Sequence, residues 1–213
     1  MPGSLTIIGS RDGTGKSFFA MELLHVMAEG GQKVHFISLE DTISEMGRRL
    51  SLGLAHPNLS VSFPASGGVV ECASIMERLM CVVAIDYLQI CVLDTNETTF
   101  SREGQVAGIP RHLKNTARRL GLPVILTSQV GRPKMGYTEF DMPSKYELAE
   151  SSRIEKPSEY IIMMCPEADR EHVVLELAKA KDAPIGFRTR LRRGPGGRLV
   201  APSREEVSLD DGE

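Results

Sequence analysis

Short apolar runs alternate along this chain with longer stretches in which apolar residues recur at helical spacing. Strands are predicted at residues 5–8, 34–39, 59–63, 81–85, 124–128, 160–165 and 173–178. Helices are predicted between them, at residues 17–29, 42–55, 69–80, 102–120 and 144–154. Strands that alternate with helices are typical of a mostly parallel sheet with helices on both faces. The pattern therefore predicts an α/β fold.

Three segments interrupt this alternation. Residues 130–147 lack periodicity and contain glycine and proline, and such a long loop in a compact domain is usually functional or disordered. Residues 186–200 are predicted to form a terminal hairpin whose turn is Gly194-Pro195-Gly196-Gly197. Residues 203–213 are polar and acidic, which predicts a solvated, disordered tail. We therefore predict one domain over residues 1–202, followed by this tail.

The first apolar run leads directly into a glycine-rich loop. Residues 10–17 read Ser-Arg-Asp-Gly-Thr-Gly-Lys-Ser and are followed by a predicted helix. A strand, such a loop and a helix form the P-loop or Walker A pattern, whose glycines let several backbone N–H groups converge on one phosphate. This context favours a nucleotide site over a glycine-rich turn that happens to precede a lysine.

The positions of this loop have separate expected roles. Lys16 would reach the β- and γ-phosphates, and the hydroxyl of Ser17 would bind Mg²⁺. The N-terminal dipole of the next helix would face the phosphates. Ser10 replaces the first glycine of the usual pattern, and Gly9 stands one place earlier. The predicted nucleotide-binding residues are Ser10, Arg11, Asp12, Gly13, Thr14, Gly15, Lys16, Ser17 and Phe18.

A P-loop enzyme needs acidic residues at the ends of neighbouring strands. Asp86 and Asp94 each follow an apolar run and each could hold Mg²⁺ through water, and composition does not choose between them. Glu40 follows another strand at the edge where an α/β sheet presents its ligands, so we expect it to polarise the attacking water. For the next residues we prefer a structural role, with Asp41 or Thr42 as a helix N-cap.

Five motifs in order carry a family resemblance. They read Ser-Leu-Glu at 38–40, Ile-Asp-Tyr-Leu-Gln at 85–89, Pro-Val-Ile-Leu-Thr-Ser-Gln at 123–129, Leu-Ala-Glu-Ser-Ser-Arg-Ile-Glu at 148–155 and Lys-Ala-Lys-Asp-Ala-Pro-Ile-Gly at 179–186. Over about residues 5–200, the chain resembles the C-terminal RecA-type motor domain of the DnaB family of replicative helicases. The resemblance implies a RecA-like fold and selects Asp86 for the metal. It also implies that Glu40 is the catalytic glutamate and Gln129 the γ-phosphate sensor.

The family's Lys-x-Arg pair, which reaches into the neighbouring subunit's ATP site, is altered here. It aligns with Lys179 and Lys181. Lysine keeps the positive charge but lacks the bidentate fork of arginine, so we expect weaker activation between subunits. The alternative is that Lys181 is only a solvated charge at a strand end.

The family follows DNA backbone phosphates with the segment that aligns with residues 148–155. Ala149 and Ser152 replace an arginine and a glycine of that segment. Arg132, Lys134 and Lys145 in the preceding loop would supply phosphate contacts instead, although such scattered charges are about as often simply solvated. The candidate DNA-binding residues are Arg132, Lys134, Lys145, Glu150 and Ser152.

Composition narrows the class of protein. The 213 residues are 41% hydrophobic and 25% charged, which suits one α/β domain with a proper core. The net charge of −3 excludes a generally basic protein, so any DNA contact needs a local patch. The four cysteines form no C-x-x-C pair and are expected to be buried, reduced thiols. With no transmembrane run and no signal peptide in sight, we expect a cytoplasmic protein.

These patterns together predict a single RecA-like α/β domain that hydrolyses ATP with Mg²⁺. By resemblance, it is expected to form a ring, most simply a hexamer, and to unwind DNA while moving along a single strand. Replication partners such as a loader or a primase are implied, although no helical collar domain precedes the P-loop in this sequence. The alternatives are a RecA/RadA-like recombination or repair ATPase, and a regulatory module that binds ATP without unwinding.

Overall fold

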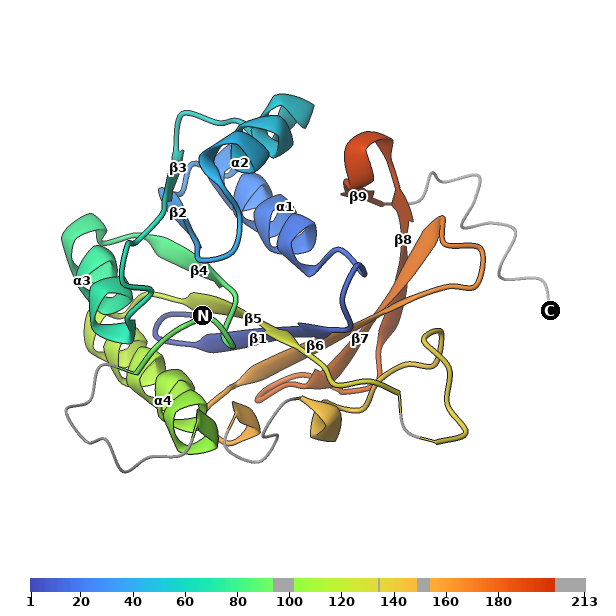
Figure 1. Cartoon of the computed structure of the whole chain (residues 1–213). Coiled ribbons are helices and arrows are strands. Elements are labelled where there is room, and N and C mark those ends of the chain that lie inside the picture. Colours follow the sequence, from blue (N-terminus) through green and yellow to red (C-terminus); the bar gives the residue numbers. More distant parts are fainter. Residues whose placement is uncertain (94–101, 134, 149–153, 202–213) are drawn as a thin grey trace.

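The computed structural model describes residues 1–93, 102–133, 135–148 and 154–201. Its strands are β1 (Leu5–Ser10), β2 (Val34–Ser38), β3 (Leu59–Ser62), β4 (Val82–Asp86), β5 (Val124–Gln129), β6 (Tyr160–Pro166), β7 (His172–Lys179), β8 (Arg188–Arg193) and β9 (Leu199–Val200). They form a nine-stranded sheet in the order β3-β2-β4-β5-β1-β6-β7-β8-β9 (Figure 1). The strands from β3 to β6 in this order are parallel, whereas β7, β8 and β9 are antiparallel additions. The predicted mostly parallel sheet and C-terminal hairpin are both confirmed.

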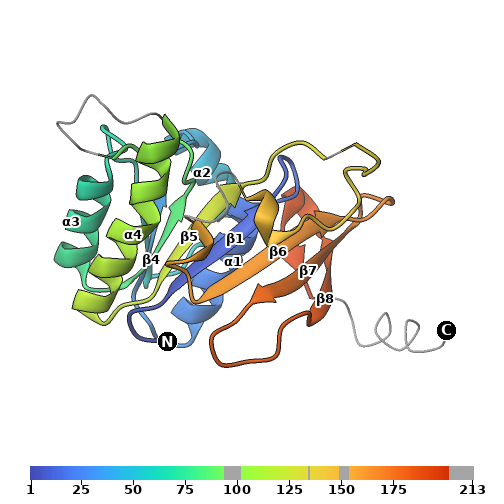
Figure 2. The same cartoon turned by 90° about the horizontal axis from the view of Figure 1, so that it is seen from below.

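Helices cover the two faces of the parallel strands. They are α1 (Lys16–Glu29), α2 (Ile43–Arg49), α3 (Val69–Leu79) and α4 (Arg102–Leu120), with the shorter helical turns η1 (Leu50–Leu54), η2 (Lys145–Glu147) and η3 (Pro195–Gly197). Figures 1 and 2 show α1 on one face and the pair α3 and α4 on the other. One hydrophobic core lies under α3 and α4, and a second lies under α1.

Strand β1 shows how the sequence builds these two cores. Leu5 and Ile7 belong to the core under α3 and α4, whereas Ile8 belongs to the core under α1. Successive side chains of a strand point to opposite faces, so one apolar run supplies both cores. All residues of β2 and β4 are buried, as expected for strands covered on both faces.

The predicted strands and most predicted helices are present, with small shifts at their ends. The helix predicted at 42–55 is shorter than expected. Thr42 caps α2 through a capping box with Glu45, and α2 ends at Arg49. Gly53, inside η1, has a φ of 92°, which interrupts the helical backbone. The N-cap is therefore Thr42, and Asp41 has a different role.

The continuous helix predicted at 144–154 is wrong at its start. Residues 145–147 form only η2, one 3₁₀ turn closed by a capping box between Ser144 and Glu147, whereas Ile154 is helical. Leu148 then pairs with Val130 in an antiparallel bridge, which requires extended backbone and ends the turn. Residues 149–153, like the tail at 203–213, lie outside the described residues.

Two expectations from composition meet the structure directly. All four cysteines are free and buried, as expected for reduced thiols. Among the helices of the described residues, none combines the length and the apolar character that crossing a membrane requires.

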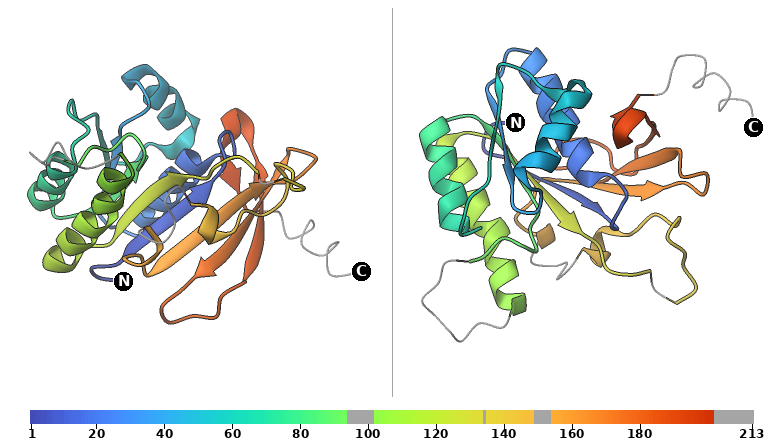
Figure 3. Two further views of the ribbon diagram at one scale, coloured as in Figure 1. Left: turned by 60° about the horizontal axis from the view of Figure 1, so that its bottom comes forward. Right: turned by 45° about the horizontal axis from the view of Figure 1, so that its top comes forward.

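The carboxyl ends of the parallel strands meet at one edge of the sheet. In the strand ladders, Ser10 lies beside Gln129, and Ser38 lies beside Asp86. Because β5 and β4 separate β1 from β2, the connections from these strands diverge and a crevice opens at this edge. Figure 3 shows the loop after β1 and the loop after β5 at this end of the sheet. The predicted P-loop is therefore placed where α/β proteins bind their ligands.

Candidate nucleotide-binding site

The loop between β1 and α1 has the backbone of a phosphate cradle. Gly13 has a φ of 71°, and Gly15 has a φ of 107°, so both positions need glycine for conformational reasons. A Cβ atom at Gly13 would meet nothing within 4 Å, so backbone conformation and not space fixes this residue. Gly15 is the N-cap of α1 and no side chain caps this end, which leaves first-turn amides to bind an anion.

The glycine one place before the usual position, Gly9, is closely packed. A Cβ atom there would lie 2.6 Å from Leu148 and 2.9 Å from the sulfur of Met163, so the ends of these two side chains would have to shift to admit it. Ser10 is fully buried, and its hydroxyl donates to the carbonyl of Arg11 at 3.0 Å. Ser10 therefore belongs to the end of β1 and completes the loop through its backbone.

A cavity of about 470 Å³ opens directly over this loop. It brings together the P-loop, the segment after β2, the residue after β4 and the turn after β8. Of the predicted nucleotide-binding residues, Asp12, Gly13, Gly15, Lys16, Ser17 and Phe18 line it, and Glu40 lines it as well. The other lining residues are Asp41, Glu45, Arg49, Tyr87, Arg193 and Gly197.

Two carboxylates, Glu40 and Asp86, lie at the edge of the sheet where this cavity opens, and Glu40 lines it. Glu40 follows β2 on its exposed rim, and burial together with the nearby charge of Asp86 raises the pKa of the Glu40 carboxyl above its ordinary value. Asp86 ends β4 with no exposure to solvent. One of its oxygens accepts from the hydroxyl of Thr127, and the other, Oδ2, has no hydrogen-bond partner. Because the charge of Asp86 contributes to this shift, a cation between the two carboxylates would favour the ionised form of Glu40.

The donor set fits a hard divalent cation. Magnesium prefers one or two carboxylates, hydroxyls and water, beside the phosphates of a nucleotide. Asp86 Oδ2 is a buried carboxylate oxygen that still needs a partner, and Ser17 offers a hydroxyl at the first turn of α1. Mg²⁺ at this place would also relieve the repulsion that raises the pKa of Glu40.

The Lys16 side chain extends from the P-loop toward Tyr87, the residue after β4. Its Nζ atom is 3.6 Å from the carboxylate of Asp12 and 5.1 Å from the centre of the Tyr87 ring. The Lys16 side chain is only 8% exposed, whereas Asp12 is largely in solvent. A phosphate would therefore bind the largely buried ammonium of Lys16 and replace Asp12, whose exposed ion pair with Lys16 contributes little.

Arg49 is a cation of the site that the sequence did not reveal. It reaches back from the last turn of α2 and pairs with Asp41 at 2.8 Å, and its guanidinium lies 4.9 Å from the centre of the Phe18 ring. One guanidinium nitrogen of Arg49 and one oxygen of Asp41 remain buried without partners. Burial raises the pKa of Asp41 although Arg49 opposes the shift. Asp41 thus orients Arg49 at the cavity.

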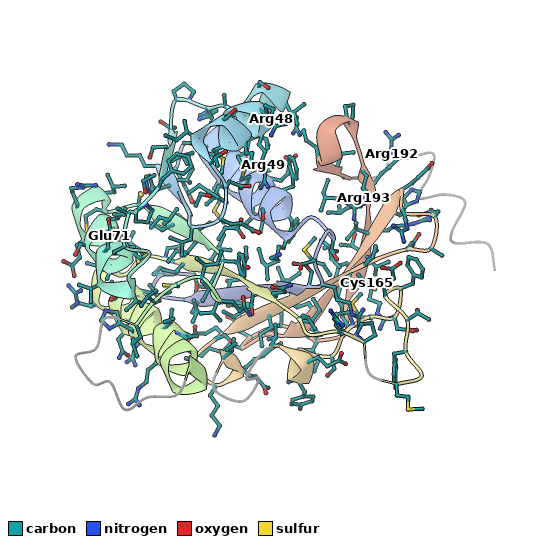
Figure 4. The ribbon with its side chains drawn as sticks, viewed as in Figure 1. Arg48, Arg49, Glu71, Cys165, Arg192 and Arg193 are labelled. Atoms are coloured by element: carbon teal, nitrogen blue, oxygen red, sulfur yellow. The ribbon has the colours of Figure 1, made fainter. Side chains whose placement is uncertain are left out.

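Arg193 is a second such cation and comes from the opposite end of the sequence. Its Nη2 atom donates to the carbonyls of Thr14 at 2.8 Å and Gly13 at 3.2 Å. Burial lowers the pKa of this guanidinium. Figure 4 labels Arg49 on α2 and Arg193 on β8, which approach the P-loop from two different elements. Arg193 therefore braces the P-loop from within its own chain.

Gln129 is not brought into the P-loop cavity. Its backbone is fixed by Gln89, whose amide accepts from the Gln129 N–H at 3.0 Å and donates to the Gln129 carbonyl at 3.1 Å. Gln129 instead lines an adjacent cavity of about 540 Å³ between the P-loop and the loop after β5. Thr14 and Asp12 also line this second cavity, so the two cavities meet at the P-loop.

The two candidate trans-acting lysines lie away from their own P-loop. Lys179 ends β7 opposite Ile161, close to the start of β6, whereas the P-loop follows the other end of the parallel strands. The Nζ atom of Lys179 donates to the carbonyl of Glu155 at 2.6 Å, and burial lowers its pKa. Lys181 follows β7 and is exposed. Of the pair, Lys181 is the one presented to solvent.

The candidate DNA-binding residues have unequal surroundings. Arg132 is exposed and lines the cavity beside the loop after β5. Lys145 already pairs with Glu155 at 2.9 Å, and this hydrogen bond raises the pKa of the lysine. The remaining candidates, Lys134, Glu150 and Ser152, lie outside the described residues, as does Asp94.

Comparison with known proteins connects this site with a family. The replicative DNA helicase DnaB of Treponema pallidum is 31% identical over 105 residues, which cover 49% of this chain and 23% of that protein. DnaB of Pasteurella multocida is 25% identical in a match that covers 99% of this chain and 51% of that protein. The chain thus spans about a sixth to a half of the length of the curated relatives it matches.

Solved structures agree on the fold. One of them, an isolated ATPase domain, superposes with a TM-score of 0.80 at 22% identity, and the match covers 95% of this chain and 86% of that chain. A DnaB-like replicative helicase described with its interactions with primase gives the same TM-score and identity over 59% of its length. The family model of the DnaB-like helicase C-terminal domain matches residues 70–198. Because that match covers more than half of the sequence, this chain belongs to the family of DnaB-like helicase C-terminal domains.

Proposed function

We propose that this chain is the motor of a ring-forming, ATP-dependent DNA helicase that acts on single-stranded DNA in replication. The observation that carries the proposal is the convergence of the P-loop and Glu40 on one cavity, with the buried carboxylate of Asp86 at the same edge of the sheet, in a chain of this family. The curated relatives are named as replicative helicases. Their activity is extended to this chain as an inference, because the chain spans only part of their length.

The residues of the cavity divide the work of ATP hydrolysis. P-loop amides and Lys16 would bind the phosphates, and Lys16 would neutralise negative charge in the transition state. Mg²⁺ would be held by the Ser17 hydroxyl and, through water, by Asp86. Glu40 would accept a proton from the attacking water, and its raised pKa makes it a better base than an ordinary carboxylate.

Assembly into a ring, most simply a hexamer, would complete this site. Lys179 and Lys181 lie at the edge of the sheet away from their own P-loop. A cation at Lys181 would therefore act on a neighbouring subunit's nucleotide and couple hydrolysis to movement between subunits. Gln129 would sense the γ-phosphate only after a shift toward the P-loop cavity, since it now lines the adjacent one.

Contact with single-stranded DNA is proposed for the loop that follows β5. Arg132 offers an exposed cation there, and Lys134, Glu150 and Ser152 remain candidates by sequence. Lys145 would contribute only after leaving Glu155. A loader or a primase is proposed as a replication partner on the family relation alone, since one structural neighbour is described with primase.

The test is the ATPase rate with and without single-stranded DNA, on a sample sized by light scattering. We expect a Mg²⁺-dependent ATPase that DNA stimulates, in an oligomer that forms with ATP. A slow ATPase that is indifferent to DNA, in a monomer, would overturn the proposal in favour of a regulatory ATP-binding module. Stimulation by DNA in open filaments without strand separation would instead favour a RecA/RadA-like recombination ATPase.

A further inference from the structure

Arg11 belongs to the P-loop by sequence, but its side chain leaves the nucleotide cavity. It extends to the loop of residues 135–148, and the residue is 9% exposed. Its Nη1 atom donates to the carbonyl of Asp141 at 2.7 Å and to that of Glu139 at 3.2 Å. Its Nη2 atom lies 3.7 Å from the carboxylate of Glu147. One buried guanidinium therefore links the phosphate-binding backbone to three points of another loop.

The 135–148 loop is held together by hydrogen bonds between its own residues, so it can move as a rigid unit. The Asp141 carboxylate accepts from the N–H and the hydroxyl of Thr138, and the Ser144–Glu147 capping box closes η2. The bridge between Val130 and Leu148 fastens the base of the loop. A displacement at Asp141 would therefore move the loop rather than deform one residue of it.

Among the described residues, the hydrogen bonds between this loop and the P-loop are those of Arg11. The cavity of about 540 Å³ separates the two, with Arg11, Thr14 and Glu139 among its lining residues. Thr14 Oγ1 and Arg11 Nε are buried there without hydrogen-bond partners. The loop is fastened on its other side, where Met142 and Leu148 pack on the core under α3 and α4 and Cys165 Sγ donates to the Glu139 carbonyl at 3.6 Å. The side that faces the cavity is therefore the part of the loop that a ligand can shift. The hydrogen bonds of Arg11 cross this gap.

Side-chain contacts also link this loop to β7, the strand that precedes Lys181. Lys145, at its C-terminal end, pairs with the Glu155 carboxylate at 2.9 Å, and the Glu155 carbonyl accepts from Lys179 at 2.6 Å. Contacts therefore run from the P-loop through Arg11, the 135–148 loop and Glu155 to the end of β7.

We propose that Arg11 is a positioning residue that couples nucleotide binding at the P-loop to the position of the 135–148 loop. Bound phosphate would restrain the P-loop backbone on either side of Arg11, and the guanidinium would extend that restraint to the carbonyls of Glu139 and Asp141. Because coupling is reciprocal, DNA held by the region after β5 would also favour nucleotide binding. This last consequence rests on the proposed function, whereas the loop coupling itself requires only nucleotide binding.

Hydrogen exchange of the intact chain tests the coupling without DNA. We expect AMP-PNP with Mg²⁺ to slow amide exchange in the P-loop and, by about 5-fold or more, in the 135–148 loop. In Arg11→Met, at AMP-PNP concentrations that saturate protection of the P-loop, the slowing in the 135–148 loop should disappear. Arg11→Lys should keep part of it, because one ammonium lacks the planar fork that reaches both carbonyls.

Arg170→Met is the matched control. Arg170 donates to the Glu139 carboxylate at 2.7 Å, so it contacts the same loop from the β6–β7 side, but it does not contact the P-loop. This variant should keep the nucleotide-dependent slowing. Equal slowing in Arg11→Met and the parent, or P-loop protection in the parent without any change in the 135–148 loop, would overturn the proposal. If Arg11→Met does not fold, Arg11→Lys against Arg170→Met gives the same decision.

A second measurement separates this inference from the proposed function. The affinity for an oligo-dT strand is measured with and without AMP-PNP, and the ratio of the two is compared among the variants. We expect about 5-fold or more in the parent and in Arg170→Met, and a ratio near one in Arg11→Met. A parent that does not bind oligo-dT would refute the proposed function while the exchange test still decides the role of Arg11. A parent that binds DNA with a ratio of one would refute the reciprocal coupling alone.

Discussion

Two buried polar side chains on neighbouring strands differ in how completely they are hydrogen-bonded. His35, in the middle of β2, places Nδ1 at 2.7 Å from the Ser60 hydroxyl and Nε2 at 2.8 Å from the Ser62 hydroxyl. Asp86, at the end of β4, satisfies one oxygen through Thr127 and leaves the other without a partner. Burial holds the pKa of His35 at about 4, so His35 is neutral and fully paired, whereas Asp86 is buried and incompletely paired.

The comparison extends to the groups around each residue. The unpaired buried side-chain atoms of the described residues belong to Arg11, Thr14, Asp41, Arg49 and Asp86. Each of these residues lines one of the two cavities at the P-loop or ends a strand at the same edge of the sheet. Leaving a buried polar group unpaired is costly, so such groups persist where a ligand or a partner completes them. Buried polar atoms without hydrogen-bond partners therefore indicate the proposed nucleotide site, whereas burial of a polar side chain alone does not.

The largest expected effect is the loss of hydrolysis in Lys16→Ala. Lys16 contributes an ammonium beside the P-loop and belongs to neither hydrophobic core. The variant should therefore melt near the parent temperature while its ATPase falls to background. Thermal melting and phosphate release on one preparation check both statements. A variant that hydrolyses ATP at the parent rate contradicts the assignment of the P-loop.

Glu40→Gln should bind ATP and hydrolyse it about 100-fold more slowly or worse, because an amide does not accept a proton from water. Single-turnover hydrolysis and a nucleotide-binding titration measure the two steps separately. Loss of binding together with hydrolysis would assign Glu40 a structural role. In the parent, kcat/KM, which reports groups of the nucleotide-free protein, should fall on acidification as Glu40 becomes protonated, and it should do so above the ordinary pKa of a glutamate because that pKa is raised.

Several of these features were accessible from the sequence because they depend on local patterns. The apolar runs predicted the strands, and the order strand, glycine loop and helix predicted the P-loop. Glu40 and Asp86 were accessible because parallel strands present their carboxyl ends at the same edge. Choosing Asp86 over Asp94 needed the family resemblance. The apolar segment before Asp94 forms no strand in the described part of the chain, and Val92 makes only an isolated bridge with Gly68.

Arg49 and Arg193 were not accessible in the same way, because their roles depend on tertiary register. Arg193 is the last of several arginines in β8, and these arginines face different partners. Arg188 pairs with Glu176 and Arg190 with Glu167, whereas Arg193 reaches the P-loop carbonyls. No local signal separates it from its neighbours. The start of the helix predicted at 144–154 was also missed for a tertiary reason. The capping box of η2 forms, but Leu148 then pairs with Val130 in extended backbone and the helix does not continue.

Asp86→Asn exchanges the charged carboxylate, with its unpaired oxygen, for a neutral amide of nearly the same shape. The substitution should weaken Mg²⁺-dependent ATP binding while leaving the ligand-free melting temperature unchanged or higher, because it removes a buried, incompletely paired charge. Melting curves with and without MgATP report both effects. Asp94→Asn is the control and should keep the ligand-dependent increase. Equal losses in the two variants would contradict the assignment of the metal strand.

Lys179 and Lys181 also differ in how completely they are paired, and this difference predicts which of them can act on a neighbouring subunit. Lys181 is exposed, whereas Lys179 is held by Glu155, so Lys181→Ala should bind ATP normally and hydrolyse it poorly. Mixing it with Lys16→Ala should restore part of the rate, because an intact P-loop would then meet an intact Lys181 on the neighbouring subunit. The readout is ATPase across mixing ratios, in subunits shown to exchange. No recovery at any ratio would contradict action in trans.

The smallest expected effect concerns His35, the fully paired member of the comparison. Its pKa is about 4 in the fold, against an ordinary 6.5, because burial and the charge of Arg78 disfavour the protonated ring. Between these values the unfolded chain binds a proton that the folded chain does not. The contribution of His35 to stability is therefore complete above pH 6.5 and declines as the pH falls toward 4.

Between pH 7 and pH 5 the parent should lose about 1–2 kcal/mol more unfolding free energy than His35→Gln, whose amide hydrogen-bonds but does not titrate. Urea unfolding of both proteins at each pH measures this difference, and the ATPase at pH 7 should be the same in both. Parallel pH profiles would show that His35 is not the neutral, fully paired group that the comparison requires.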